Sequence, residues 1–296
     1  MFCPHQLSAA RSIGVLLLLI FVHENVTAQD RSAFGPDTIF QWGGGEYVDG
    51  GPDLTMPLVT DRPDFTEASS TVGVRVAQLE FGYTYTYDNN AGTSVRGHSF
   101  PETLLRYGMI RDWLELRVGL NYAEERTRTA VASTTLKGAE DLYLGFKIGL
   151  TPQDGILPEM AIIPQAMVPT GSASFNQGQM LPGANWIYSW EICDRLGTAG
   201  STQINRSLDG TTSNPFYEVA QSWTVAVSLT DRVGAYTEWY AFFPTGADTQ
   251  IPEHYFNGGF TYLLSDDFQI DVRAGVGLNQ AADDYFVGVG GVVRRW

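Results

Sequence analysis

The sequence predicts an all-β fold, a transmembrane antiparallel β-barrel of about twelve strands with short periplasmic turns and longer extracellular loops. Three observations predict it. Side chains alternate between apolar and polar with a period of two over most of the chain. The connections between these stretches alternate between short and longer ones. Each stretch has about eleven residues, which at a tilt near 45° rise about 25 Å, the height of an outer-membrane apolar band.

The N-terminus is typical of a secretory signal. A basic start that includes Arg11 leads into an apolar run over 13–22, too short to cross a bilayer as a helix, and small residues ending at Ala28 offer a cleavage site. We expect a signal peptide over 1–28, an N-terminal periplasmic or lumenal segment over 29–75 and the barrel over 76–296. After cleavage Cys193 is the lone cysteine, so no intramolecular disulfide is expected. The mature chain is expected in the outer membrane of a diderm bacterium.

The period of two is clear in the stretch 76–87. Leu79 and Phe81 share one face of an extended chain, and Gln78 and Glu80 share the other. The same pattern predicts strands at 76–87, 100–110, 113–123, 139–150, 158–169, 185–193, 197–206, 217–229, 233–243, 254–264, 267–278 and 284–296.

The connections predict two different rims. Tight connections are expected at 111–112, 151–157, 194–196, 230–232 and 265–266, and longer ones at 88–99, 124–138, 170–184, 207–216, 244–253 and 279–283. An antiparallel barrel with one short-turn rim and one long-loop rim produces this alternation, and an even number of strands places both chain ends on the periplasmic rim. A soluble β-sandwich gives no reason for it.

One face of the strands is large and apolar, and the other mixes small residues with charges of both signs. A lumen of about twelve strands is wide enough for side chains and water, so we place the mixed face inside. Two roles stay open for its charges: structural ion pairs that fill the interior, or groups that select solutes. The candidate lumenal charges are Glu80, Glu102, Arg106, Glu115, Arg117, Asp141, Lys147, Glu238, Asp271 and Arg273.

A charged stretch precedes the first strand and can be interpreted in two ways. In a turn, Pro63 would fix the backbone and the Asp61 carboxylate would accept hydrogen bonds from nearby backbone amides. Stretches rich in Asp and Pro are mostly turns. As a lumenal plug, its charges would pair with those of the barrel interior. The candidate plug residues are Asp61, Arg62, Pro63, Asp64, Phe65 and Glu67.

Aromatic residues are expected at the membrane interfaces and at the C-terminus. Trp296 ends the chain, as an aromatic residue does in barrels recognised by the outer-membrane assembly machinery, although Arg294 stands where an apolar residue is usual. Membrane lipids and this machinery are therefore expected partners. Four aromatics near the loop bases would form either an outer girdle, which we favour, or an apolar mouth: Phe242, Phe243, Tyr255 and Phe256.

Several classes of function are excluded. A net charge of -15 argues against nucleic acid as a partner. Catalysis needs a nucleophile within reach of a base. Ser99 adjoins His98 in sequence, and neighbours along a strand face opposite sides. His98 and His254 lie on separate loops, and no spacing of carboxylates matches a known calcium loop. We expect no enzyme activity, no catalytic residue, no metal site and no cofactor.

The sequence also resembles a known family. TDRPDFTEASSTV followed by VAQLEFGYTY closely resembles the start of outer-membrane barrels in the family named for the meta-pathway of phenol degradation. Further similar stretches follow in order along the mature chain: LLRYGMIRDWLELRVGLNY, GAEDLYLGFKIGL, VPTGS, SLTDRVGAYTEWYAFFP, HYFNGGFTYLLSDDFQIDVRAGVGLN and ADDYFVGVG.

The resemblance implies a barrel that passes small, often aromatic, compounds across the outer membrane. The predicted function is a channel for passive uptake of a small-molecule solute, hydrophobic or aromatic. The alternative is a non-conducting barrel that stabilises the envelope or binds a partner through its acidic loops. A filled lumen favours the alternative, and a continuous water path favours the channel.

Overall fold

The computed structural model describes residues 37–44 and 52–296, so the expected signal peptide over 1–28 lies outside the described residues. Apart from one short 3-10 helix, η2 (Trp42–Gly44), the regular elements of the described chain are strands: β1 (Ala77–Asn90), β2 (Thr93–Gly108), β3 (Leu114–Arg128), β4 (Ser133–Ala139), β5 (Leu142–Thr151), β6 (Glu159–Val168), β7 (Leu181–Cys193), β8 (Leu196–Leu208), β9 (Pro215–Ser228), β10 (Val233–Thr245), β11 (Glu253–Ser265), β12 (Phe268–Gly277) and β13 (Tyr285–Arg295). No helix in these ranges is long and apolar enough to cross a membrane.

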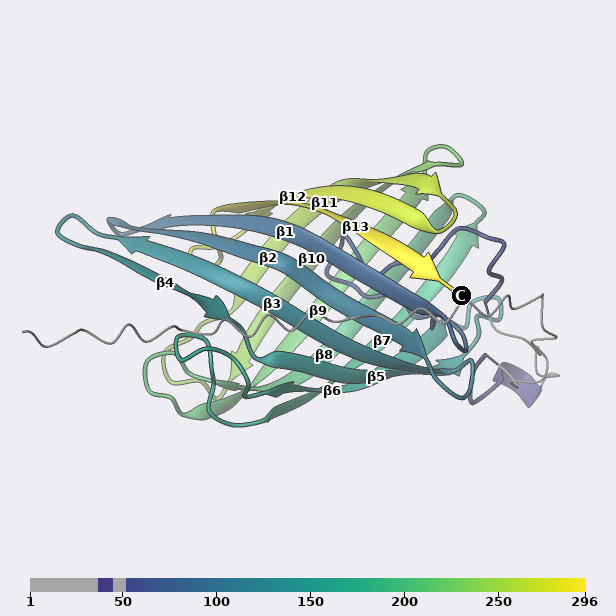
Figure 1. The fold of residues 1–296 in the computed structure, drawn as a ribbon, viewed down its shortest axis with the longest axis horizontal. Helices are drawn as coiled ribbons and strands as arrows, with labels where there is room; N and C mark the ends of the chain where they lie inside the picture. The colour runs from purple at the N-terminus through teal and green to yellow at the C-terminus, as the bar shows by residue number, and fades with distance from the viewer. Residues whose placement is uncertain (1–36, 45–51) are drawn as a thin grey trace, which may run out of the picture.

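The strands form a closed antiparallel barrel (Figure 1). β1 pairs with β2 on one side and with β13 on the other, which closes the ring without a free edge in the wall. β4 pairs with the outer part of β3 and β5 with its inner part, so the two together occupy one position and the barrel has 12 strands. In a closed barrel the backbone N–H and C=O groups of the wall form hydrogen bonds with neighbouring strands, which lipid could not supply. The predicted fold class is confirmed.

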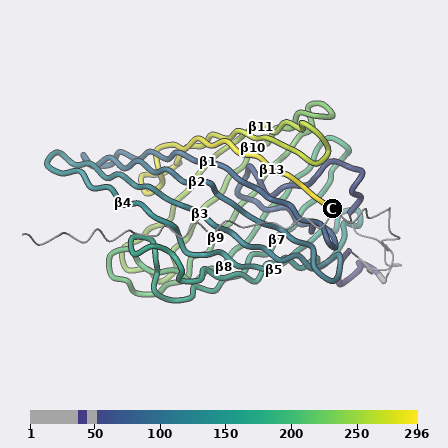
Figure 2. Tube along the Cα trace, in the orientation of Figure 1, coloured from purple at the N-terminus to yellow at the C-terminus, as the bar shows by residue number. Residues whose placement is uncertain are grey.

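The described structure differs from the predicted connections at two places. β1 and β2 continue to a turn at Ala91–Gly92, and β3 and β4 continue to residues 129–132, so most of 88–99 and 124–138 is strand. Figures 1 and 2 show these strands projecting past the rest of the rim. A hairpin outside the membrane meets water on both faces, so its side chains carry no apolar alternation to reveal it.

The two faces of the wall follow the predicted assignment. Large apolar side chains such as Phe81, Trp186 and Phe260 are exposed on the outer surface, where lipid would cover them. Charged side chains such as Arg106 and Arg117 are fully buried inside. The core of the molecule is therefore a polar lumen.

Residues 52–75 run from the short-turn rim into this lumen. At the rim, the amide of Leu58 donates to the carbonyl of Asp266 (2.8 Å), and the Arg294 guanidinium donates to the carbonyls of Leu54 and Met56 (3.0 and 2.9 Å). Arg294, unusual for its position near the C-terminus, thus ties down the N-terminal chain. In Figure 2 the purple trace before β1 lies at the end of the barrel that holds the C-terminus and continues between the strands.

Candidate functional site in the barrel lumen

The lumenal segment, residues 60–72, is held in the barrel by the carboxylate of Asp61. One oxygen lies 2.6 Å from Arg117 Nη1 and 3.3 Å from Arg106 Nε, and the other lies 2.9 Å from Lys147 Nζ. These cations come from β3, β2 and β5. The carboxylate also accepts the amide of Ala68 at 2.9 Å, which is the local bond expected of a turn. The segment is therefore folded on itself and inserted among the predicted lumenal charges.

Two wall carboxylates complete this cluster. Glu115 accepts from Arg106 (2.8 Å) and Arg117 (2.9 Å), and it also accepts the amide of Val72 at 2.9 Å. Glu80 lies 3.4 Å from Arg106 and accepts the amide of Asp61 at 3.1 Å. Buried charges are tolerated when they are paired and hydrogen-bonded. Glu115 meets that condition through both of its oxygens, and Glu80 meets it through Oε1 alone.

Arg62 points the other way, toward β12 and β13. Its guanidinium lies 2.9 Å from Glu102 Oε2 and 3.2 Å from Asp271 Oδ1. It occupies a slot formed by Gly82 and Gly290, which are paired across β1 and β13. A Cβ atom at either glycine would come within 2.6 Å of the guanidinium. The two glycines on the inner face thus make room for this side chain.

The middle of the segment is held through its backbone. Glu238 on β10 accepts the amides of Phe65 and Thr66, both at 2.7 Å. Asn257, on the adjacent strand β11, donates to the same carboxylate at 2.8 Å. A charge-assisted bond to a backbone amide is about twice as strong as a neutral one, so Glu238 fixes the chain independently of side-chain identity.

Further contacts extend around the wall. Glu67 accepts from Arg117 (2.6 Å) and from Asn185 on β7 (2.9 Å), and Ser69 donates to Glu159 on β6 (2.7 Å) and lies 2.7 Å from Ser189 Oγ. The lumenal segment therefore contacts strands on opposite sides of the barrel and crosses the lumen.

The structure brings together nine of the ten candidate lumenal charges. Arg273, for example, donates to the carbonyl of Pro63 at 3.0 Å and lies 3.7 Å from Glu102. The exception is Asp141, which lies between β4 and β5 and accepts the amides of Gly171 and Gln177 in an outer loop. Its carboxylate holds that loop and does not join the ion pairs around Asp61. The nine in contact with the cluster or the segment are Glu80, Glu102, Arg106, Glu115, Arg117, Lys147, Glu238, Asp271 and Arg273.

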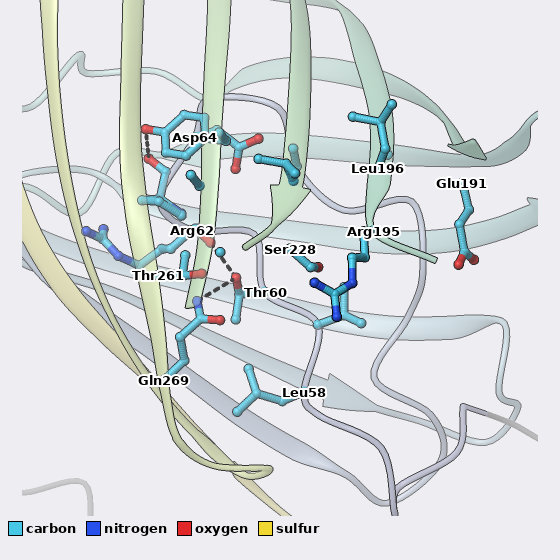
Figure 3. Close-up of a pocket in the computed structure, with 18 of the residues that line it drawn as sticks. Leu58, Thr60, Arg62, Asp64, Glu191, Arg195, Leu196, Ser228, Thr261 and Gln269 are labelled. Atoms are coloured by element: carbon cyan, nitrogen blue, oxygen red, sulfur yellow. Dashed lines mark hydrogen bonds between the residues drawn. The ribbon is translucent and has the colours of Figure 1, made fainter. Parts of the chain in front are cut away.

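A cavity lies on each side of the lumenal segment. On the short-turn side, a cavity of about 420 Å³ is lined by Thr60, Pro63 and Asp64 of the segment and by the β7–β12 part of the wall. Figure 3 shows Leu58, Thr60 and Asp64 on one side of this cavity and Arg195 and Ser228 on the other, with the Arg62 guanidinium directed away from Arg195. On the long-loop side, a cavity of about 240 Å³ has Phe65 as its only lining residue from the described segment. Residues 62–65 separate the two.

The wall of the outer cavity contains aromatics that strand alternation assigns to the inside. Phe242 and Tyr255 line it, whereas their chain neighbours Phe243 and Phe256 face outward and contact or lie beside His254. Of the four candidate aromatics, only Phe243 and Phe256 therefore lie where an outer girdle would be. Sequence reasoning missed Tyr240 and Phe286 because it treated the face with large apolar residues as the lipid face. Their parity with Glu238 and Gly288 was the available signal.

The histidines show no shared site. The ring of His98 lies 2.7 Å from the Tyr83 hydroxyl, and the ring of His254 stacks on Trp239 with centroids 6.1 Å apart. Across residues 37–44 and 52–296 no group of three or more His, Cys, Asp or Glu residues is arranged to hold a metal ion.

Comparison with known proteins identifies both family and fold. The family model described as "Putative MetA-pathway of phenol degradation" matches residues 60–294. An outer-membrane channel from Pseudomonas putida F1 has a similar structure, with a TM-score of 0.57, 12% identity, and coverage of 79% of this chain and 99% of that one. The transport unit of the autotransporter AIDA-I from Escherichia coli has a TM-score of 0.51 and 8% identity, with coverage of 78% of this chain and 94% of that one. The translocator domain of the autotransporter NalP from Neisseria meningitidis has a TM-score of 0.50 and 9% identity, with coverage of 76% of this chain and 89% of that one. No curated protein matches the sequence.

Proposed function

Because the chain belongs to the family described as the MetA-pathway of phenol degradation, a family of outer-membrane barrels by its fold, we propose that it is a passive outer-membrane channel for small hydrophobic or aromatic molecules whose passage is controlled by the lumenal segment. One observation carries the proposal. The partition between the inner and outer cavities is made by residues 62–65, a tethered piece of chain, and by the side chains that hold it.

The chemistry of these contacts favours a movable partition over a permanent filling. A lumen filled for stability alone is served equally well by apolar side chains, because burying charges has a desolvation cost that ion pairs barely offset. Here Asp61, Arg62 and Glu67 are all charged and all paired with the wall. Ionic contacts can be exchanged for water when the segment leaves, whereas an apolar plug would expose its surface.

Movement of this segment has a clear route. Its N-terminal side is attached at the short-turn rim through Leu58, and its C-terminal side is attached through Val74, whose amide donates to Asp112 at 2.8 Å. Between these points the chain has no regular secondary structure. Withdrawal toward the short-turn rim would join the two cavities without any change in the strands.

The same contacts favour a second candidate function. A lumen crossed by a segment with buried ion pairs on opposite walls is what a non-conducting barrel would have. In that case the barrel would serve the envelope or a partner, and the segment would stay in place.

Conductance in a planar bilayer distinguishes the two functions. We would compare the chain that begins at residue 29 with a shorter chain that begins at residue 74, and show by heat-modifiable migration in detergent that both are folded. The proposal predicts brief or rare openings for the longer chain and steady conductance for the shorter one. Equal, steady conductance would contradict control by the segment. Silence from both folded chains would favour the non-conducting barrel.

A further inference from the structure

Four exposed cations lie on the long outer hairpins of a protein whose net charge is -15. We name them the outer basic patch: Arg96 on β2, Arg126 and Arg128 on β3, and Lys137 on β4. Figure 1 shows β1–β4 continuing past the rest of the rim, and the patch lies on this continuation. It is therefore a concentration of positive charge on an acidic protein, at the extracellular end of the barrel.

Strand alternation places the patch on the outside of the wall. Leu120 of β3 is exposed on the outer surface, and Arg126 follows it by an even number of residues, so the two share a face. Arg96 is the direct partner of Arg126 across β2 and β3, and Lys137 pairs in the same way with Glu124 of that face. The patch is therefore continuous with the surface that lipid covers and has no part in the lumen.

The height of the patch matches the headgroup layer of a membrane. The outer face of β3 changes from apolar to charged after Tyr122, whose ring lies 5.2 Å from that of Phe100 on β2. Aromatic residues of a barrel lie at the membrane interface. At about 3.3 Å per residue and a tilt near 45°, Lys137 lies about 5 Å and Arg126 about 9 Å above this aromatic pair. The polar layer on each side of a bilayer is about 5–8 Å thick, and long basic side chains extend to it from its edge.

The arginines are opposed to one another and lack carboxylate partners. Arg96 and Arg126 stand directly opposite on adjacent strands, an arrangement that destabilises a strand pair when no anion lies between the charges. Within the described residues, the ion pairs are formed by other cations, in the lumen and at the short-turn rim. Arg126 Nε donates to Ser133 Oγ at 3.4 Å, and the Arg96 guanidinium lies 5.9 Å from the centre of the Tyr87 ring. Neither contact neutralises a charge.

The chemistry of two neighbouring guanidinium groups defines the ligand. Each binds a phosphate through two parallel hydrogen bonds, and opposite residues of an antiparallel pair have Cα atoms only about 4.5–5.5 Å apart. Arg96 and Arg126 can therefore hold one phosphate between them, with Arg128 and Lys137 beside it. We propose that the outer basic patch binds the phosphate groups of an anionic glycolipid in the outer leaflet. Continuity with the lipid-covered face favours a lipid phosphate over a soluble one.

This inference goes beyond the proposed function. The patch lies on the outside of the wall, whereas the lumenal segment and its ion pairs lie inside. A bound glycolipid would anchor the projecting hairpins at the membrane surface whether or not solute passes through the barrel. Binding at the patch and passage through the lumen can therefore fail independently.

The test is native mass spectrometry of the folded protein in detergent, titrated with lipid A, a phosphorylated glycolipid. The comparison ligands are the same lipid after removal of its phosphates, and inorganic phosphate. Arg96→Gln/Arg126→Gln removes the opposed pair. Arg206→Gln is the matched control, because Arg206 also lies 5.9 Å from the ring of its direct partner, the exposed Tyr217, but faces no second arginine there. Heat-modifiable migration shows that each variant is folded.

We expect the double substitution to weaken binding of lipid A about tenfold or more, because hydrogen bonds from charged donors are lost. Arg206→Gln should leave the affinity unchanged. Glu124→Gln should tighten binding about two- to fivefold, since Glu124 is a carboxylate on the same face and repels the phosphate. Lipid A without phosphates should bind the parent and the double variant equally weakly.

Three results would overturn the inference. The first is an equal effect of Arg96→Gln/Arg126→Gln and Arg206→Gln on lipid A binding. The second is equal affinity of the parent for lipid A with and without its phosphates. The third is binding of inorganic phosphate as tight as that of lipid A, which would make a soluble anion the ligand. Sensitivity of lipid A binding to the double substitution alone would support the patch, also in a barrel that conducts in no form.

Discussion

A single carboxylate, that of Asp61, neutralises three cations from three different strands. Arg106, Arg117 and Lys147 are fully buried. Their other carboxylate partners are Glu115 and Glu80 of the wall and Glu67 of the segment, which pairs with Arg117. Removing one partner of a buried ion pair is strongly destabilising because the remaining charge is left without compensation. Asp61 is therefore the residue on which docking of the lumenal segment depends most.

Replacing Asp61 with Asn tests this at the residue scale. Loss of one partner from a buried ion pair costs about 3–5 kcal/mol, which here falls on the docked state of the segment. We expect the open fraction in single-channel recordings to rise by at least about tenfold. Asp231→Asn is the control, since the Asp231 side chain is fully exposed at a turn of the wall and lies 4.0 Å from Arg195. An Asp61→Asn trace like that of the control would contradict the role given to Asp61.

At the scale of elements, two outer hairpins are joined by one buried side chain. Asp209, after β8, accepts the amides of Thr211 and Thr212 in its own loop and those of Asp248 and Thr249 in the loop after β10, at 2.8–3.1 Å. Burial would raise the pKa of Asp209, but these amides, which favour the ionised form, lower it well below its usual range. Because the folded-state pKa is depressed, this contribution to stability is present above the unfolded value near 4 and is lost as the pH falls through the folded value.

The expected result of Asp209→Asn is looser outer hairpins at neutral pH. Limited proteolysis should cut the loops 209–214 and 246–252 several-fold faster in the variant than in the parent at pH 7. The difference should shrink as the pH is lowered toward the depressed pKa, because the parent then also loses its carboxylate. A difference that is the same at every pH, or absent, would show that Asp209 does not clasp these loops through its charge.

Sequence periodicity predicts the strands of the wall well because each strand separates lipid from water. The predicted stretch 267–278 corresponds to β12 (Phe268–Gly277), and 233–243 to the greater part of β10 (Val233–Thr245). The errors occur where this separation ends. β4 (Ser133–Ala139) lies outside the apolar band and is exposed along most of its length, so nothing in its pattern distinguishes it from a loop.

At the scale of the whole molecule, the sequence places charges on the inner face but cannot say what fills the lumen. Glu238 carries no sign that it would accept the amides of Phe65 and Thr66, since a backbone partner leaves no mark in the side-chain pattern. The turn interpretation of the stretch from Asp61 was favoured by composition, and its local bond to Ala68 exists. Its ion pairs with distant strands depend on closure of the barrel, which local sequence rules do not contain.

The central claim is that solute passes only when the lumenal segment leaves the lumen, and a reversible lock tests it most directly. Ser69 Oγ and Ser189 Oγ are 2.7 Å apart, so cysteines at these positions could form a disulfide between segment and wall. The exposed Cys193 would be replaced by serine to prevent other pairings.

The measurement is the flux of 4-fluorophenol into liposomes that contain the Ser69→Cys/Ser189→Cys protein, oxidised and then reduced in the same preparation. The account predicts no flux above empty liposomes when the disulfide is closed and recovery of flux on reduction. The single Ser189→Cys variant should show flux under both conditions. Equal flux through the oxidised and reduced protein would contradict control by the segment, and no flux in either state or in the single variant would contradict passage itself.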